Sequence, residues 1–169
     1  MLQNLHVKNL ALIDECEVEF SEGLNIMSGE TGAGKSIIIG SINLALGEKV
    51  PKEMLRDNEQ TAFVELIFYV DNDDILDKLK ALDIEIEDDR TVILSRKITA
   101  QRAVGRINGE AVPVSKMKEA ASLLIDIHGQ HEHQSLLSKK NHLQILDEYA
   151  GEDMKNLKAQ MAALYREYK

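Results

Sequence analysis

The stretch Gly29-Glu30-Thr31-Gly32-Ala33-Gly34-Lys35-Ser36 decides the fold of this chain. It consists of Gly, four variable positions and then Gly-Lys-Ser, which is the pattern of a phosphate-binding P-loop when a strand precedes it and a helix follows it. Gly23–Ser28 is a short apolar run of the buried-strand type, and Ile37–Leu46 predicts an apolar helix that Gly47 ends. This context favours a P-loop over the alternative, a glycine-rich turn that happens to precede a helix.

The residue types of the motif fit the binding of a nucleoside triphosphate. Gly29, Gly32 and Gly34 allow the backbone to pass close to phosphate oxygens, so that amide N–H groups and the positive end of the next helix face the anion. Lys35 adds a point charge at the β- and γ-phosphates, and we count it among the catalytic residues. The Ser36 hydroxyl is predicted to bind Mg²⁺. The predicted nucleotide contacts are Gly29, Glu30, Thr31, Gly32, Ala33, Gly34, Lys35 and Ser36.

Length, charge and cysteine content exclude several classes of protein. At 169 residues the chain can form one domain, or one domain with an appendage. A net charge of −9 argues against a general nucleic-acid-binding surface, because affinity for phosphate backbones needs clustered Lys and Arg. Cys16 is the single cysteine, and the sequence has neither a signal peptide nor an apolar run of roughly 18 residues that could span a membrane. We expect a cytoplasmic protein without a membrane partner.

The segments around the motif predict a largely antiparallel sheet. Alternating apolar residues mark two strands, Leu2–Leu10 and Ile13–Phe20, that would form a hairpin. A third strand is predicted at Thr61–Val70, which is rich in β-branched and aromatic residues. Asp71-Asn72-Asp73-Asp74 lacks the Gly and the distal Glu of a calcium loop, so we interpret it as a turn and a helix N-cap. Asn108-Gly109 signals a tight turn. The other predicted strands are Val92–Ile98, Ala103–Ile107 and a short one around Val112-Pro113-Val114.

The remainder of the chain is predicted to be mainly helical, apart from the polar cluster His128–Gln134. One helix begins at Ser115 and reaches Leu124, and a short helix beyond the cluster ends at Gly151. Apolar residues then recur at spacings of three and four, which is typical of a coiled coil. Because this helix reaches Lys169 without a Gly or a Pro, we expect the sequence to be cut from a longer protein. The recurring residues are Met154, Leu157, Met161, Leu164 and Tyr168.

Three short segments carry a family resemblance. Glu30-Thr31 stands where SMC heads usually have Pro-Asn, Asp126–Gln134 resembles a distinctive glutamine-loop segment, and Arg106–Gly109 resembles the hairpin between them. Together they resemble the RecN family, SMC-like members of the ABC ATPase class that act in bacterial DNA repair. The resemblance covers essentially the whole chain. It implies an α/β P-loop NTPase of the ABC/SMC head type, with a mixed sheet that has an antiparallel part, and with the start of a coiled coil.

The resemblance implies an ATPase head that is formed by two half-heads, which a long coiled coil joins. The resemblance implies that residues 1–150 are the N-terminal half-head and that 151–169 begin the coiled-coil arm. The Walker B motif, the catalytic glutamate and the signature would lie in the other half, so that this chain alone is inactive and the full-length protein is an ATPase. The implied cofactors are ATP and Mg²⁺, sandwiched between two heads. The implied partners are the C-terminal half-head, a second head of a homodimer and, through the full-length protein, DNA. The implied role is double-strand break repair and recombination, at a cytoplasmic, nucleoid-associated location.

The resemblance also implies roles for side chains outside the P-loop. Gln130 would contact Mg²⁺ and the attacking water as a catalytic residue, since a neutral amide can both donate and accept hydrogen bonds. Gln134 is the competing assignment. Arg56 is similar to an arginine that SMC heads place near nucleotide or DNA, although it equally fits a solvated loop charge. The cluster at 128–134 could bind zinc, but it lacks the Cys and the spaced ligand pairs of structural zinc sites, so we expect its histidines to pack around the nucleotide-binding loop.

Two other functions remain open. A self-contained P-loop kinase or GTPase would use Leu123-Leu124-Ile125-Asp126 as a Walker B strand, with Asp126 bound to Mg²⁺. The N-terminal hairpin, the lack of an acidic residue directly after Asp126 and the terminal apolar repeat argue against it. A non-enzymatic interaction module would expose the seam of the coiled coil and the open part of the sheet, and would self-associate.

Overall fold

The computed structural model describes residues 1–29, 34–51, 54–57, 59–127, 142–143, 146–147, 149–150 and 152–168. The chain divides into two compact units, Met1–Ile125 and Asp126–Lys169. The first unit contains a sheet with helices α1 (Lys35–Ala45), α2 (Asp73–Ala81) and α3 (Val114–Leu124). The second unit contains helix α5 (Glu152–Tyr168). The predicted division into residues 1–150 and 151–169 stays a prediction.

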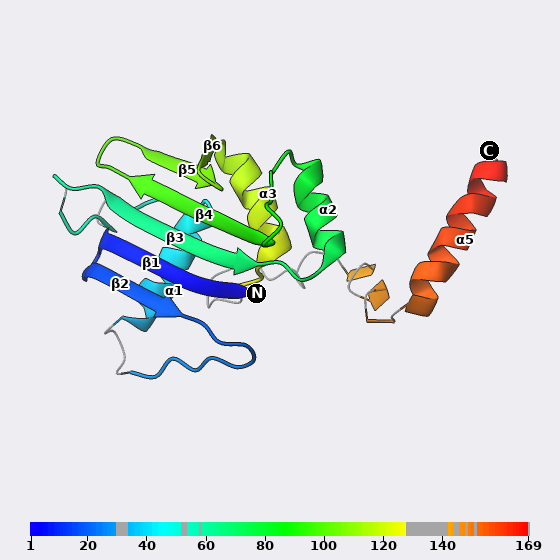
Figure 1. Cartoon of the computed structure of the whole chain (residues 1–169), viewed down its shortest axis with the longest axis horizontal. Helices are drawn as coiled ribbons and strands as arrows, with labels where there is room; N and C mark the ends of the chain where they lie inside the picture. Colours follow the sequence, from blue (N-terminus) through cyan, green and yellow to red (C-terminus); the bar gives the residue numbers. More distant parts are fainter. Residues whose placement is uncertain are drawn as a thin grey trace. The chain divides into compact units, whose positions relative to one another are not determined.

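In the described part of the chain, six strands form one antiparallel sheet in the order β2-β1-β3-β4-β5-β6 (Figure 1). The predicted N-terminal hairpin is confirmed, since β1 (Leu2–Leu10) pairs with β2 (Ile13–Glu19). Strand β1 also pairs with β3 (Ala62–Tyr69), which places the hairpin at one edge of the sheet. The other strands are β4 (Thr91–Ile98), β5 (Ala103–Ile107) and β6 (Glu110–Val112).

Local turn and cap signals account for the connections of the second half of the sheet. Asn108 and Gly109 both have positive φ, 47° and 85°, as the predicted tight turn requires. The Asn72 side chain accepts a hydrogen bond of 2.8 Å from the Asp74 backbone N–H, which confirms the predicted N-cap of α2. The short strand predicted around Val112-Pro113-Val114 is misplaced: β6 ends at Val112, because Pro113 has no N–H for a ladder and instead precedes α3.

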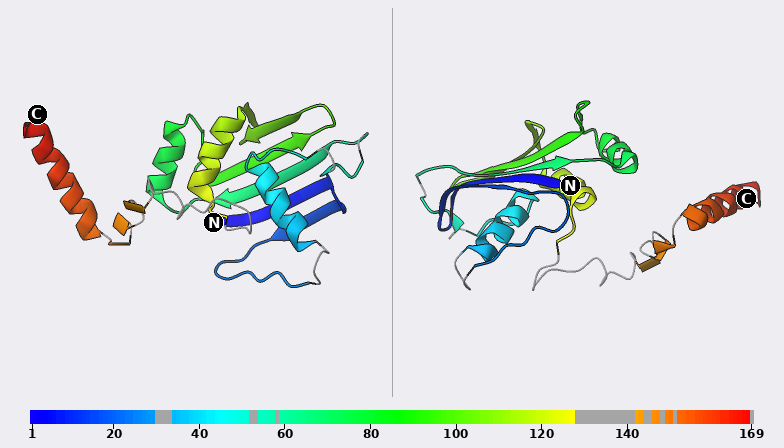
Figure 2. Two further views of the ribbon diagram at one scale, coloured as in Figure 1. Left: turned by 180° about the vertical axis from the view of Figure 1, so that it is seen from behind. Right: turned by 60° about the horizontal axis from the view of Figure 1, so that its bottom comes forward.

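One face of the sheet is apolar and is covered by α1 and α3 (Figure 2). In β3 the buried residues alternate with partly exposed ones, as expected when only one face is packed. The predicted apolar helix after the P-loop motif is confirmed, and most of its apolar residues are buried on the sheet. The buried apolar residues of these elements are Leu5, Val7, Leu10, Ile38, Ile42, Leu44, Ala45, Ala62, Val64, Leu66, Phe68, Val92, Leu94, Ile98, Ile107, Met117, Ala120 and Ala121.

The prediction of a buried strand at Gly23–Ser28 is wrong for this chain. The segment has no regular secondary structure, and the side chains of Leu24 and Ile26 are 86% and 81% exposed. Asn25 instead bonds to the backbone of Ser21, accepting at 3.0 Å and donating at 2.8 Å. A strand needs a neighbour, and no described segment pairs with this one, so the mixed part of the predicted sheet does not form within the described chain.

Helix α5 confirms the predicted C-terminal helix and keeps its apolar residues exposed. Leu157, Met161, Leu164 and Tyr168 are all more than half exposed. Its assignment as the start of a coiled-coil arm stays a prediction. No helix among the described residues combines the length and apolar character needed to cross a bilayer.

Candidate nucleotide-binding site

Helix α1 begins directly after Gly34, whose backbone conformation few other residues can adopt. Gly34 precedes the helix with φ 143° and ψ −30°, a conformation that residues with a Cβ rarely adopt. Its carbonyl accepts a hydrogen bond of 2.9 Å from the Ile38 N–H. No side chain caps this end, and its first turn contains no acidic residue. The positive end of α1 is therefore not offset by a carboxylate of its own helix.

The two ends of the P-loop motif meet at Lys35. The Lys35 ammonium donates a hydrogen bond to the carbonyl of Gly29. Ser36 follows on the first turn of α1 and is exposed. Residues 30–33 lie outside the described part of the chain. The structure thus brings together Gly29, Gly34, Lys35 and Ser36, four of the eight predicted contacts.

Helix α1 is held at its far end by a side chain that the motif analysis missed. Arg96 on β4 is only 5% exposed and donates from Nη1 to the Leu44 carbonyl at 2.8 Å and to the Glu48 carbonyl. Burial lowers the pKa of Arg96, but a guanidinium remains charged at neutral pH. The alternation of β4 places Arg96 on the same inward face as Val92, Leu94 and Ile98, but no local pattern of the sequence gives its hydrogen-bond partners. Gly47, with φ 103°, ends the helix region as predicted.

Arg56 lies on a loop that is tied to the β1–β2 turn. Its Nη1 donates to the Leu12 carbonyl at 3.4 Å, and its side chain is exposed. Asn9 holds the same loop: it donates to the carbonyls of Asp57 and Gln60 at 2.9 and 3.1 Å and accepts from the Asp57 N–H at 2.9 Å. The predicted contact of Arg56 with nucleotide or DNA stays a prediction.

The predicted glutamine-loop residues cannot be placed. Gln130, Gln134 and the rest of the histidine cluster, residues 128–134, lie outside the described residues.

The kinase or GTPase alternative needs a Walker B strand at Leu123–Asp126, and the structure does not have one, since Leu123 and Leu124 end helix α3. Asp147-Glu148 follows two apolar residues and is a second candidate for a Walker B motif in the sequence. A Walker B motif ends a strand, whereas Leu146 and Asp147 are helical, and Asp147 forms an ion pair with Lys158.

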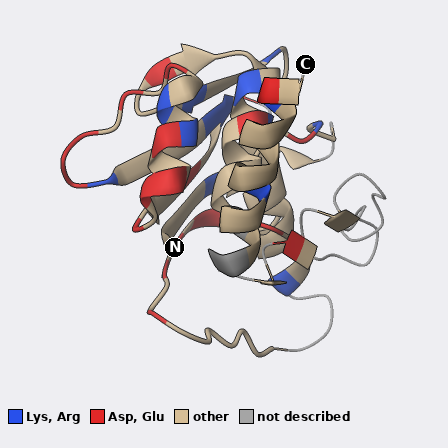
Figure 3. Ribbon diagram, turned by 90° about the vertical axis from the view of Figure 1, so that its right-hand side faces the viewer, with Lys and Arg blue, Asp and Glu red and all other residues tan. Residues whose placement is uncertain are grey.

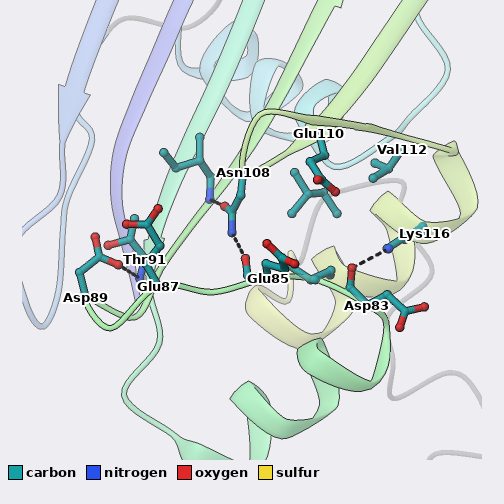
Figure 4. A pocket seen from close by; sticks show the side chains of 12 residues that line it. Asp83, Glu85, Glu87, Asp89, Thr91, Asn108, Glu110, Val112 and Lys116 are labelled. Atoms are coloured by element: carbon teal, nitrogen blue, oxygen red, sulfur yellow. Dashed lines mark hydrogen bonds between the residues drawn. The ribbon is translucent and has the colours of Figure 1, made fainter.

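An acidic cavity of about 280 Å³ lies between the α2–β4 connection, the β5–β6 hairpin and α3 (Figure 4). Its walls are fixed by Asn108, which accepts from the Ile93 N–H at 2.8 Å and donates to the Glu85 carbonyl at 2.6 Å, and by Lys116, which donates to the Asp83 carbonyl at 3.0 Å. None of its lining residues belongs to α1 or to the P-loop motif. Within the described residues, no group of three His, Cys, Asp or Glu side chains could hold a metal ion.

A comparison with protein families agrees with the geometry at α1. A family model described as an AAA domain matches residues 4–169. The chain belongs to the AAA domain family. Along the ribbon in Figure 3, positions of Lys and Arg alternate with positions of Asp and Glu, and the net charge of the chain is −9.

Curated relatives confirm the RecN resemblance of this AAA domain. It is 41% identical over 170 residues to the DNA repair protein RecN of Halalkalibacterium halodurans, covering 99% of this chain and 30% of that protein. It is 39% identical over 157 residues to RecN of Bacillus subtilis, covering 92% of this chain and 27% of that protein. The chain thus spans less than a third of the relatives that it matches.

The predicted fold class is confirmed by a solved structure. The similar chain comes from a study of ATP-driven dimerization and DNA-stimulated activation of SMC ATPases. The TM-score is 0.55 at 16% sequence identity, over 83% of this chain and 82% of that one. At this identity the similarity concerns the fold, which is that of an SMC head.

Proposed function

We propose that this AAA domain is the ATP-binding part of an SMC-like ATPase head that acts in the repair of DNA double-strand breaks. The observation that carries the proposal is the meeting of Lys35 and Gly29 at the N-terminus of an apolar helix that is buried on a sheet. The similarity to RecN proteins supports the role in DNA repair. The SMC-head fold supports an ATPase rather than a self-contained kinase or GTPase.

The residues at the start of α1 fit ATP together with Mg²⁺. The Lys35 ammonium, which donates to the Gly29 carbonyl, would transfer to the phosphates, where a stronger, charge-assisted hydrogen bond is available. The exposed Ser36 hydroxyl can bind Mg²⁺, and Gln130 is proposed as a further contact to the metal and to water. When bound, Mg²⁺ neutralises charge on the phosphates. Gly34 provides the backbone turn that lets the helix end approach the anion.

The rest of the parent protein would complete the head. Leu24 and Ile26 are two residues apart and highly exposed, which is the spacing of one face of a strand. We propose that this segment pairs with a strand of the C-terminal half-head, that a second head closes over the nucleotide, and that DNA is contacted by the full-length protein. A cytoplasmic, nucleoid-associated location accompanies this function.

Replacement of Lys35 tests the proposed function. In the parent protein, Lys35→Ala should weaken the binding of a fluorescent ATP analogue by about 30-fold or more, because it removes the charge-assisted contact to the phosphates. Lys49→Ala is the matched control, since Lys49 is exposed on the connection that follows α1. Its affinity should stay within about twofold of the unaltered protein. Equal affinities of the Lys35 and Lys49 variants would reject the site.

A further inference from the structure

Arg96 is a buried cation without a carboxylate partner in the described chain. It lies in the middle of β4, opposite Val64 on one side and Gly105 on the other, on the face that carries Val92, Leu94 and Ile98. Among the described residues no salt bridge involves it, and its Nε has no hydrogen-bond partner there. Burial of such a charge is unfavourable unless other groups compensate for it.

The compensating groups belong to the C-terminal end of α1. Leu44 is in the last turn of the helix, and Glu48 follows the turn at Gly47. Their carbonyls both accept hydrogen bonds from Nη1 of Arg96. These are groups at the negative end of the helix dipole, where a cation is stabilising. A residue from the centre of the sheet thus holds the helix whose opposite end begins the candidate nucleotide site.

We propose that Arg96 is a positioning residue for nucleotide binding, which fixes the P-loop helix from its C-terminal end and thereby sets where Gly34 and Lys35 stand. The inference rests on the proposed function of the site at α1. The 11 residues of α1 span about 16 Å, so a tilt of about 5° moves the far end by roughly 1.4 Å. Errors of about 1 Å in the placement of binding groups have large effects on function.

Apolar packing alone does not provide this constraint. Ile38 and Ile42 are buried on the sheet, but apolar contacts are non-directional and permit small rotations and shifts of a helix. The two hydrogen bonds of Arg96 are directional and join one guanidinium nitrogen to two defined carbonyls. They should therefore determine the tilt of α1 more than its stability.

Three variants separate positioning from stability. Arg96→Met removes the charge and both hydrogen bonds but retains an unbranched apolar side chain, and such replacements of buried charges are often tolerated. Arg96→Lys keeps the charge with a single donor group. Val92→Ala is the matched control, because Val92 is fully buried on the same face of β4 but lies four residues from Arg96. It should lower stability by opening a cavity, without altering the end of α1.

The variants should be compared in the parent protein by titration with a fluorescent ATP analogue, thermal unfolding and amide hydrogen exchange. Arg96→Met should bind about tenfold more weakly and should exchange the amides of α1 faster, and Arg96→Lys should bind within about threefold of the unaltered protein. Val92→Ala should show the larger fall in unfolding temperature and unaltered affinity.

Four results would overturn the proposal. The first is unaltered affinity of Arg96→Met for the analogue, and the second is an equal loss of affinity in Arg96→Met and Val92→Ala. The third is that Arg96→Lys binds the analogue no better than Arg96→Met does. The fourth applies if Arg96→Met does not fold, and is unaltered affinity of Arg96→Lys although the amides of α1 exchange faster. A failure of the proposed function itself is distinguishable, because Lys35→Ala would then bind the analogue as well as the unaltered protein does.

Discussion

The side chain of Asn9 joins the end of β1 to a loop that is distant in the sequence. Asn9 is the second-last residue of β1, has φ 50°, is 4% exposed, and makes three hydrogen bonds to the backbone of Asp57 and Gln60. Asn tolerates positive φ better than most residues. The loop that carries Arg56 therefore has a fixed position beside the hairpin.

Removal of the Asn9 side chain should destabilise the fold. Asn9→Ala should lower the free energy of unfolding by about 2–3 kcal/mol, because three hydrogen bonds are lost and the Asp57 and Gln60 backbone groups are left without their partner. Urea unfolding of the chain measures the effect. Asn25→Ala is the matched control: its side chain also bonds to backbone, but in an exposed loop, so its cost should stay below about 1 kcal/mol. Equal costs for the two variants would contradict the assigned role.

The local signals of the sequence predicted much of the fold because they act through near neighbours. The hairpin of β1 and β2, the Asn72 cap and the Asn108-Gly109 turn each depend on residues a few positions apart. The bonds of Asn9 and Arg96 span 48 to 52 positions, and no local pattern gives the identity of such partners. The P-loop ends were predictable from their motif, whereas the anchor at the other end of α1 was not.

At the scale of elements, the segment Gly23–Ser28 has a strand-like sequence without a strand neighbour. Its apolar residues predicted a buried strand, which this chain does not form, because strand formation is decided by pairing and by packing against other elements. In this chain β2 forms the edge of the sheet and pairs only with β1 among the described strands. The exposed Leu24 and Ile26 thus mark a surface that a further strand would cover.

This interpretation predicts that the same substitutions lower the free energy of unfolding less in this chain than in the parent protein. Leu24→Ser with Ile26→Ser should change the free energy of unfolding of this chain by less than about 0.5 kcal/mol, because both side chains are already exposed. In the parent protein the pair should cost more than about 2 kcal/mol, since burial of each side chain is worth roughly 1.5–3 kcal/mol. Leu12→Ser, at a 76% exposed position of the β1–β2 turn, is the control and should be small in both. Identical costs in the two contexts would refute pairing of this segment.

At the scale of the whole molecule, the proposed phosphate site at the start of α1 is one part of what ATP hydrolysis needs. Phosphoryl transfer to water needs a group that orients the water and charge stabilisation at the γ-phosphate, in addition to the P-loop. The chain spans 27–30% of its RecN relatives, and no described strand ends in a Walker B acidic pair. We therefore expect this chain to bind nucleotide without hydrolysing it.

The chain alone should not hydrolyse ATP at a meaningful rate. Phosphate release should appear only when the remainder of the parent protein is added, and it should rise with protein concentration as heads pair. The Lys35→Ala version of the chain gives the background from contaminating ATPases. In the completed protein, Gln130→Ala should lower kcat more than affinity, with Gln134→Ala as its control. Turnover by the isolated chain that depends on Lys35 would favour a self-contained enzyme instead.

The strand order β2-β1-β3-β4-β5-β6 favours folding during synthesis on the ribosome. Of the five strand pairings, only that of β1 with β3 skips a strand in the sequence, so most pairings form between segments that emerge one after the other. Local contacts of this kind close quickly, and domains generally fold as units from the N-terminus as the chain is made. Met1–Ile125 can thus reach its antiparallel sheet early. Under the proposed pairing, Leu24 and Ile26 would be covered only after the partner strand has been synthesised, so the last step of the sheet would come late.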